Sequence, residues 1–264
     1  MLHPFSGPLK HPSLVWQLTV RSIAGRYRGA SFGLLWAVVT PFLMLIVYSI
    51  AFGWVMRGHW PTDRGEAGYT EILFIGLIVH SFFAEAMTAS PALVVGNSNL
   101  VKRVVFPLHV LPWPLVLSGL FHTGMNILVL LLLYLIRYGL PPWTFVLLPV
   151  VVLPLGLVVL GVGWLLASLG VYFRDIAQIT GVLATAMLFL STAIVPISSI
   201  PAPYQFIFYL NPLSFIIDQV REVALWGQLP NWSGLGLYAV LAAAFAWLSL
   251  AWFQSTRKGF ADVL

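Results

Sequence analysis

The chain has 264 residues, of which 60% are hydrophobic and 8% are charged, whereas an ordinary soluble domain has about 45–50% apolar and about 25% charged residues. A membrane-spanning helix takes about 20 apolar residues, so this composition predicts a protein whose solvent is lipid and leaves little length for an aqueous domain. The net charge of +5 is assigned to basic residues beside apolar spans, so nucleic acid is not expected as a partner, and the lack of cysteine excludes disulfides and thiolate metal sites.

The apolar runs predict an all-α integral membrane protein with six transmembrane helices in a single domain over 1–264. The spans are expected at 33–56, 71–94, 108–136, 144–170, 178–198 and 235–253, with tails at 1–32 and 254–264. With both tails in the cytoplasm, nine of the 13 Lys and Arg residues lie inside and four outside, which favours this N-in, C-in topology. The first 31 residues contain no apolar core followed by a small-residue cleavage site, so no cleaved signal peptide is expected.

The segment SLVWQLTVRSIAGRYRGA, before the first span, has the spacing of an amphipathic helix. Its apolar residues lie four, three and four positions apart, and Arg21 and Arg28 run beside them; the apolar positions are Trp16, Val20, Ile23 and Tyr27. A helix with one apolar face and one basic edge lies in the membrane interface and does not cross it. Two interpretations stay open: a surface anchor alone, or an interface helix that also contacts a cytoplasmic partner.

The stretch NSNLVKRVVFP, at 97–107, interrupts two long apolar runs with Lys102 and Arg103. Its minimum role is to fix the orientation of the neighbouring spans. A second short turn, at Arg174 and Asp175, joins the fourth and fifth spans. Both turns are expected on the cytoplasmic face, where another protein could push on the spans.

The region 199–234, between the fifth and sixth spans, is too long for a turn and too rich in proline for one span. Asn211 can cap a helix that has Pro212 at its first position, and Gly227 can end it, which predicts helices at about 203–210 and 212–226. In the second helix Leu213, Ile216, Val220 and Val223 share one face, and Ser214, Asp218, Arg221 and Glu222 supply the polar side. We expect a re-entrant pair at the outer surface that either packs on protein or lines a gate.

No pattern for catalysis is present. None of the three lysines follows a glycine, so the chain has no P-loop, and it lacks HExxH, a DxD cluster and a cysteine pair. No cofactor or metal is expected in this chain. Ser118 and His122 would share a helix face, but no acid is near them in sequence, so an intramembrane hydrolase is a weak alternative. Glu85 lies within a span and is expected either to pair with a polar group of another helix or to line a pathway.

Four segments together resemble one family, the membrane subunits of ABC polysaccharide exporters, which move O-antigen, capsule or teichoic acid chains. They are RYRGASFGLLWAVVTPFLMLIVYSIAFG near the start, NSNLVKRVVFP in the middle, GVYFRDIAQ after the fourth span and PISSIPAPYQFIFYLNPLSFIIDQVRE before the last. The resemblance covers nearly the whole chain, with the segments in the family's order.

The resemblance implies a homodimer in the bacterial inner membrane, joined to two copies of a P-loop ATPase that binds ATP and Mg, and exporting a lipid-linked glycan. The interface helix would end at Arg26, Tyr27 and Arg28. The ATPase-coupling residues would be Asn97, Ser98, Asn99, Leu100, Val101, Lys102, Arg103, Val104, Phe106 and Pro107, with Arg174 and Asp175. The outer gate and glycan path would include Tyr204, Phe206, Phe208, Tyr209, Asn211, Pro212, Phe215, Asp218, Arg221 and Glu222.

Other functions stay open on the residues alone. A permease for a drug or another lipid would share the same architecture. An ion-driven secondary transporter would usually show related halves, and no internal repeat is visible. The many Trp, Tyr and Phe side chains suit sugar faces, but they also form the interfacial belts of any membrane protein.

Overall fold

The computed structural model describes residues 10–51, 68–101 and 106–264. Within these ranges every regular element is helical. The longer α-helices are α2 (Pro12–Arg26), α3 (Trp36–Tyr48), α4 (Tyr69–Ala89), α7 (Pro112–Tyr138), α8 (Leu148–Tyr172), α9 (Ile176–Phe189), α11 (Pro212–Ala224) and α12 (Trp232–Thr256). The shorter ones are α5 (Ala92–Val95), α6 (Ser98–Val101), α10 (Gln205–Leu210) and α13 (Phe260–Val263), and 3₁₀ turns include η1 (Gly33–Leu35), η3 (Leu108–Val110), η4 (Trp143–Leu147), η5 (Ile197–Ser199), η6 (Ala202–Tyr204) and η7 (Arg257–Gly259). The expected all-α class is confirmed for the described residues.

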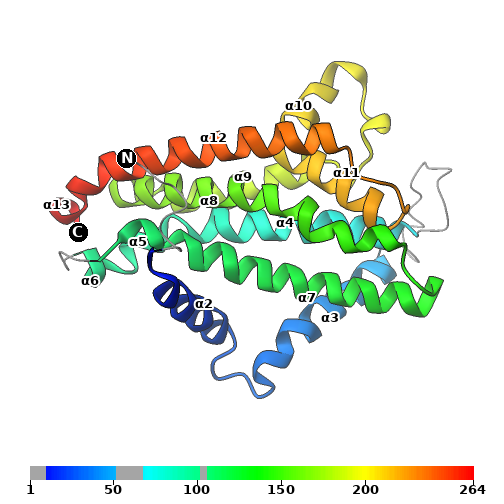
Figure 1. The fold of residues 1–264 in the computed structure, drawn as a ribbon, viewed down its shortest axis with the longest axis horizontal. Coiled ribbons are helices and arrows are strands. Elements are labelled where there is room, and N and C mark those ends of the chain that lie inside the picture. Colours follow the sequence, from blue (N-terminus) through cyan, green and yellow to red (C-terminus); the bar gives the residue numbers. More distant parts are fainter. Residues whose placement is uncertain (1–9, 52–67, 102–105) are drawn as a thin grey trace.

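The long helices α4, α7, α8 and α12 run alongside one another and form the body of the molecule (Figure 1). Helix α8 lies in the core, and its Trp164 is fully buried. Small residues let the helices approach closely: a Cβ added to Gly161 of α8 would lie 2.6 Å from the Phe245 ring of α12. Close approach of this kind is how helices gain packing energy in lipid, where no hydrophobic force drives them together.

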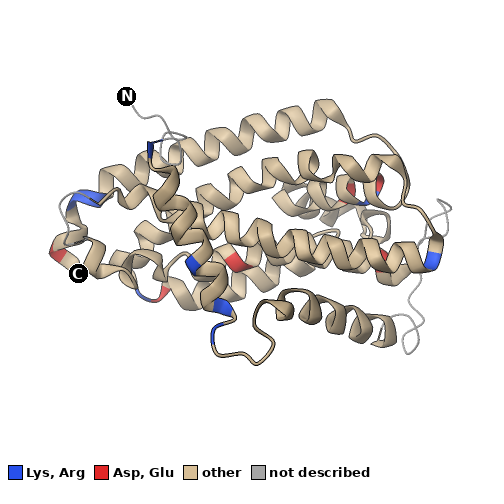
Figure 2. Ribbon diagram, turned by 60° about the horizontal axis from the view of Figure 1, so that its bottom comes forward, with Lys and Arg blue, Asp and Glu red and all other residues tan. Residues whose placement is uncertain are grey.

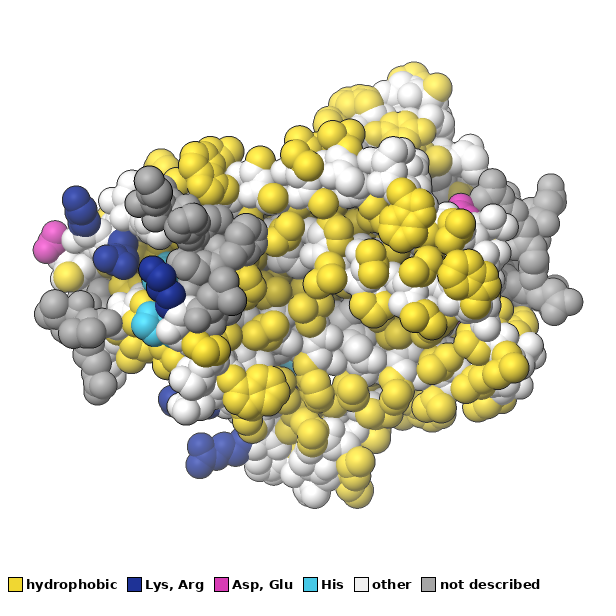
Figure 3. Space-filling model, in the orientation of Figure 1, with side chains coloured by type: hydrophobic (Ala, Val, Ile, Leu, Met, Phe, Trp, Pro, Cys, Tyr) yellow, Lys and Arg dark blue, Asp and Glu magenta, His cyan; other side chains and the backbone are white. Residues whose placement is uncertain are grey.

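The two ends of the helical body carry different elements. Helices α5, α6 and α13 lie at one end, and α10 and α11 lie towards the other (Figure 1). Figure 2 shows that the long helices carry little charge over most of their length. On the face drawn in Figure 3, hydrophobic side chains cover the long helices, and Lys and Arg gather towards the end with α13. The predicted coupling stretch and the predicted gate therefore lie at opposite ends.

Five helical segments of the described chain are long and apolar enough to cross a membrane. They are Gly33–Ala51, Tyr69–Ala89, Leu108–Tyr138, Trp143–Tyr172 and Trp232–Val263. The segment predicted as the fifth span, 178–198, overlaps α9, which runs from Ile176 to Phe189 and has 14 residues. At 1.5 Å per residue this helix is about 21 Å long, shorter than the roughly 30 Å hydrocarbon core. The six-span topology and its orientation therefore stay predictions.

The chain leaves the helical conformation after α9, and Arg221 of α11 supplies the hydrogen bonds that the broken backbone needs. Its guanidinium donates to the carbonyl oxygens of Thr192 (2.7 Å), Ala193 (2.9 Å) and Ile72 (3.0 and 3.1 Å), and to Asp218 (3.3 Å). All five N–H donors are thus used, although the residue is fully buried. Burial lowers the pKa of Arg221 to about 10 and the neighbouring Asp218 acts against that shift, so the side chain stays charged at neutral pH.

The predicted helix pair at 203–210 and 212–226 is confirmed as α10 and α11. The Asn211 side chain accepts from the Leu213 amide at 3.0 Å, with Pro212 at the first helical position. The predicted apolar face of α11 is buried throughout; it comprises Leu213, Ile216, Val220 and Val223. Arg221 was expected on the opposite, polar side, but its long side chain turns inward because the carbonyls of the broken segment lie there.

Helix α2 forms where the interface helix was predicted, but part of the predicted stripe faces away from the protein. Val15 and Thr19 are buried and Trp16 and Val20 are exposed, and α2 packs on α7. Trp16 and Val20 of the predicted apolar stripe are therefore free to face lipid. The neighbouring face of the helix, which carries Val15 and Thr19, packs on the protein.

We expect Arg221→Met to lower the midpoint temperature of unfolding of the purified protein in detergent. The variant keeps much of the side-chain volume, but the carbonyls of Thr192 and Ala193 lose their donor, at about 1–3 kcal/mol for each buried unpaired group. Arg221→Lys keeps the charge but has only three donors, so its unfolding midpoint should lie between those of the wild type and Arg221→Met. Arg174→Met, on an exposed turn, is the control that should keep the wild-type midpoint; equal midpoints for the Arg221 and Arg174 methionine variants would contradict the assignment.

Candidate functional site

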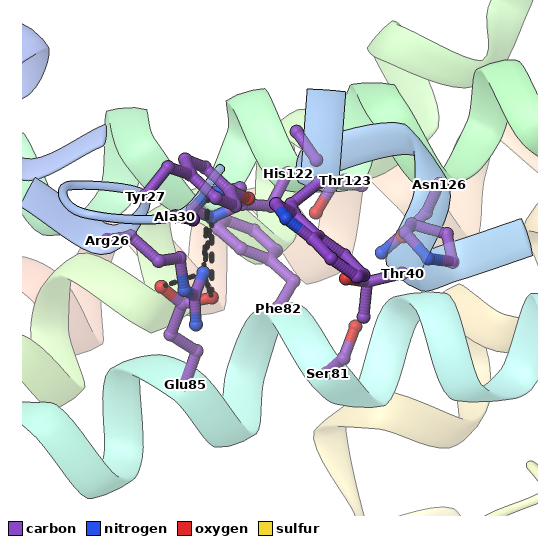
Figure 4. A pocket seen from close by; sticks show the side chains of 14 residues that line it. Arg26, Tyr27, Ala30, Thr40, Ser81, Phe82, Glu85, His122, Thr123 and Asn126 are labelled. Carbon is purple, nitrogen blue, oxygen red and sulfur yellow. Dashed lines mark hydrogen bonds and ion pairs between the residues drawn. The ribbon is translucent and has the colours of Figure 1, made fainter. Parts of the chain in front are cut away.

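A cluster of three polar side chains joins α2 to α4 and α7, two helices long enough to span a membrane. Arg26, at the end of α2, donates from Nη1 to both carboxylate oxygens of Glu85 in α4 at 3.0 Å. The same Nη1 lies 2.7 Å from Nδ1 of His122 in α7, and that nitrogen is 3.6 Å from Glu85. Figure 4 shows the three side chains converging from separate helices. The structure thus brings together residues 26, 85 and 122, which the sequence gave no reason to connect.

Local packing explains why the cluster forms. A Cβ added to Gly119 would lie 2.8 Å from the Phe82 ring, so glycine at 119 allows α7 to approach α4 closely. Residues 82 and 85 lie on one face of α4, as 119 and 122 do on α7, because positions three apart are neighbours on a helix. Glu85 therefore meets His122 across the contact. Helix α2 then ends at Arg26 against both helices.

The cluster lies at a cavity of about 520 Å³ between α2, α3, α4 and α7. Its lining combines polar and aromatic side chains: Arg26, Tyr27, Trp36, Thr40, Ser81, Phe82, Glu85, His122, Thr123 and Asn126 are among them. Figure 4 shows Thr40, Ser81, Thr123 and Asn126 beyond the ion cluster, on the α3, α4 and α7 side. A second cavity of about 190 Å³ shares Thr40, Pro41, Ser81 and Asn126 with the first. The two cavities therefore lie next to each other along α3, α4 and α7.

Glu85 pairs with Arg26 of another helix, but its side chain is 25% exposed and also lines the cavity, so both of its expected roles stay open. The intramembrane hydrolase gains no support. The Ser118 hydroxyl donates to the Leu115 carbonyl of its own helix at 3.1 Å, whereas the His122 ring faces Arg26 and Glu85. No group of three His, Asp or Glu side chains able to hold a metal occurs within residues 10–51, 68–101 and 106–264.

Two short helices lie between α4 and α7: α5 precedes the predicted coupling stretch 97–107, and α6 lies within it. The Asn97 side chain donates to the Leu93 carbonyl at 2.8 Å, and Leu100 and Phe106 pack partly buried against the core. Lys102, Arg103 and Val104 lie outside the described residues, as does the side chain of Val101. Ser98 begins α6, Asn99 is exposed and Pro107 leads into η3.

Helix α5 rests directly on α8. A Cβ added to Gly170, near the end of α8, would lie 2.8 Å from the carbonyl carbon of Pro91 and closer still to its oxygen. Pro91 is the residue before α5. Only glycine allows this contact between two backbones, so α5 and α8 touch here without an intervening side chain. Arg174 and Asp175 lie exposed on the turn that follows α8.

The predicted gate residues divide into two groups. Tyr204, Phe206 and Tyr209 are 58–70% exposed and lie on η6 and α10. Phe208 and Asn211 are buried, and the Asn211 amide donates to the Met187 and Leu190 carbonyls at the end of α9. Phe215 stacks on Tyr238 of α12 with 5.8 Å between ring centroids. The buried group holds α11 in place, and the exposed group forms the free surface.

Sequence reasoning missed a second ion pair between α4 and α7. Glu71, fully buried at the start of α4, accepts from Arg137 at the end of α7 at 2.8 Å. No contact between helices was predicted for either residue. His80 of α4 also contacts a neighbouring helix, since its Nε2 lies 2.9 Å from the Ala184 carbonyl of α9. Glu222 lines a separate cavity of about 730 Å³ with Gln219, Trp226 and Asn231.

Comparison with known proteins shows similarity over nearly the whole chain. The pattern of the family described as ABC-2 type transporter matches residues 13–225. The O-antigen export system permease protein RfbA of Myxococcus xanthus is 28% identical over 255 residues, 96% of each chain. The protein of the same name from Klebsiella pneumoniae is 26% identical over 94% of this chain and 93% of its own. The polysialic acid transport protein KpsM of Escherichia coli is 23% identical over 91% of this chain and 92% of its own.

We expect Arg26→Gln to loosen the end of α2 from α4 and α7. A partly exposed ion pair contributes about 1 kcal/mol, so the ratio of docked to undocked α2 should fall about fivefold. The chain has no cysteine, so spin labels can be placed at Ala24→Cys on α2 and Gly124→Cys on α7. Pulsed electron spin resonance then measures the distance between the two labels, which is longer when α2 is undocked. Arg21→Gln, also exposed on α2, is the control; a distance distribution unchanged by Arg26→Gln would show that the cluster does not hold the helix.

Proposed function

Since the chain belongs to the ABC-2 type transporter membrane family, we propose that it is the permease subunit of an ATP-driven exporter of a lipid-linked polysaccharide, acting in the inner membrane. The observation that carries this proposal is the end-to-end similarity to permeases named for O-antigen export. A relative named for polysialic acid transport points to the same class of cargo. The five membrane-length helices within the described residues support this proposal, since a transport path through a membrane needs such helices.

ATP hydrolysis is assigned to a separate partner subunit. The sequence contains no P-loop, so this chain has no backbone cradle for ATP phosphates. In the proposed complex two copies of the chain are joined to two copies of a P-loop ATPase. Helix α3 supports an assembly of this kind, because it leaves Phe42, Leu43, Met44 and Val47 about half exposed and so offers apolar surface to lipid or to a second copy.

In the proposed topology both tails lie in the cytoplasm and α9, with the turn after it, takes the place of the fifth span. The α5–α6 end then faces the ATPase, and the α10–α11 end faces outward as a re-entrant gate. The tight Pro91–Gly170 contact supports a coupling role for α5, since energy from outside the chain must enter through a rigid element. The exposed aromatic residues of α10 offer flat faces to a passing glycan.

The experiment that tests the proposed function is deletion of the chain combined with purification from its native membrane. Deletion should remove the surface polysaccharide and leave its lipid-linked precursor inside the cell, and the tagged chain should copurify with a P-loop ATPase. Intact surface polysaccharide together with loss of resistance to a drug would show a different exported substrate. Transport that continues after inactivation of the copurified ATPase would show an ion-driven transporter.

We expect Gly170→Ala to uncouple ATP hydrolysis from export. The added methyl group meets the Pro91 backbone, so α5 must move off α8 and its displacement is no longer transmitted. Polysaccharide export should fall at least about tenfold, the effect of roughly 1.4 kcal/mol on the coupled step, while ATPase activity persists in the purified complex. Gly181→Ala is the control on α9, where a Cβ would meet nothing within 4 Å. Normal export by Gly170→Ala would rule out this contact as the transmitting element.

A further inference from the structure

We infer that the cavity between α2, α3, α4 and α7 is a binding site for the sugar headgroup of a membrane lipid. The inference rests on the proposed function, because the lipid-linked glycan is a ligand of this class. It goes further by assigning the headgroup to one site, defined by Arg26, Glu85, Thr123 and Asn126.

The first argument is the cost of the polar lining. Thr40, Thr123 and Asn126 lie within membrane-length helices, where an unpaired polar group is unfavourable by a few kcal/mol. Within the described chain their side chains form no hydrogen bond with other residues, and all three face the cavity. Such groups in a span typically mark a ligand or solvent path. A ligand with several hydroxyl groups would satisfy them.

The second argument is charge. The Arg26 guanidinium and the Glu85 carboxylate are 3.0 Å apart, so their charges largely cancel at the cavity. An anion alone would meet the carboxylate as well as the guanidinium. A neutral polyhydroxy group instead uses both, because it donates to the carboxylate and accepts from the guanidinium. Arg26 is about half exposed, and its Nε and Nη2 donors form no hydrogen bond with the described residues.

The third argument is shape. Tyr27, Trp36 and Phe82 contribute aromatic rings to the same lining, and such rings combine flat apolar faces with, in Tyr and Trp, a polar tip. The volume of about 520 Å³ is within the range of small-ligand sites. The neighbouring second cavity shares Thr40, Ser81 and Asn126 with the first and adds Met44, Phe74, Leu77 and Ile78 to its lining. These added apolar side chains suit the start of a lipid chain beside the headgroup.

The test uses the absence of native cysteine. Ser81→Cys places a thiol in the cavity, and the permease–ATPase complex in vesicles is labelled with a small charged thiosulfonate. The probe is a farnesyl diphosphate-linked disaccharide. At about ten times its dissociation constant it should slow labelling about tenfold, because only the empty fraction reacts. Gln178→Cys, exposed at the start of α9 and outside the cavity, should be labelled at the same rate with and without the probe.

Asn126→Leu and Glu85→Gln in the Ser81→Cys background separate binding from folding. Both should lose most of the protection, since Asn126→Leu removes a polar partner of the sugar and Glu85→Gln removes the charge that accepts from hydroxyl groups and holds Arg26 in place. Asn126→Leu leaves the Arg26–Glu85 pair intact, so its unfolding midpoint should not fall, and its loss of protection cannot arise from detachment of α2.

Three results would overturn the inference. The first is no protection by the disaccharide lipid. The second is equal protection by farnesyl diphosphate without sugar, which would show recognition of the diphosphate. The third is a Ser81→Cys thiol that stays unlabelled without probe and forms a disulfide with a second copy. Each is distinguishable from failure of the proposed function, because binding is read in the absence of transport and export is read separately in cells.

Discussion

A broken helix in a membrane leaves backbone carbonyls without partners, and the protein must supply donors for them. Arg221 does so by placing all five of its donors on Asp218 and on the carbonyls of Ile72, Thr192 and Ala193. This one side chain joins α11, the start of α4 and the turn after α9. Gly76 completes the junction, since a Cβ there would lie 2.7 Å from Ala193. The end of α9 and the buried position of α11 both depend on this junction.

The opposite end of the body is built on a contact of a different kind. Where Arg221 binds carbonyls through a long side chain, Gly170 allows two backbones to touch, and Pro91 lies directly on α8. At the C-terminal side of this end, Tyr172 donates to the Thr256 carbonyl at 2.8 Å and Phe260 is fully buried. Helices α4 and α8 run between the two ends. Helix α8 therefore connects the proposed ATPase-facing elements to the elements that hold the proposed gate.

The cluster of Arg26, Glu85 and His122 lies apart from both ends of the helical body, on the side where α2 and α3 join it. Helix α3 contributes few buried residues, so polar groups on α4 and α7 are left facing a cavity and not a packed partner. The proposed binding site is thus a consequence of loose packing by one helix beside a well-packed core. Loose packing there leaves room for a ligand, and the ion cluster keeps α2 attached beside that room.

The sequence by itself determined the helical class, the apolar segments and the local caps. Composition, apolar run length and the Asn211–Pro212 cap act over a few residues, and the structure follows them closely in α4, α7, α8, α11 and α12. Periodicity also identified the buried face of α11. Only the tertiary structure decided the length of α9, the inward turn of Arg221 and the meeting of Arg26 with Glu85 and His122. These outcomes depend on hydrogen bonds and close contacts between residues 28 to 149 positions apart, and no local pattern encodes which partners will meet across that distance.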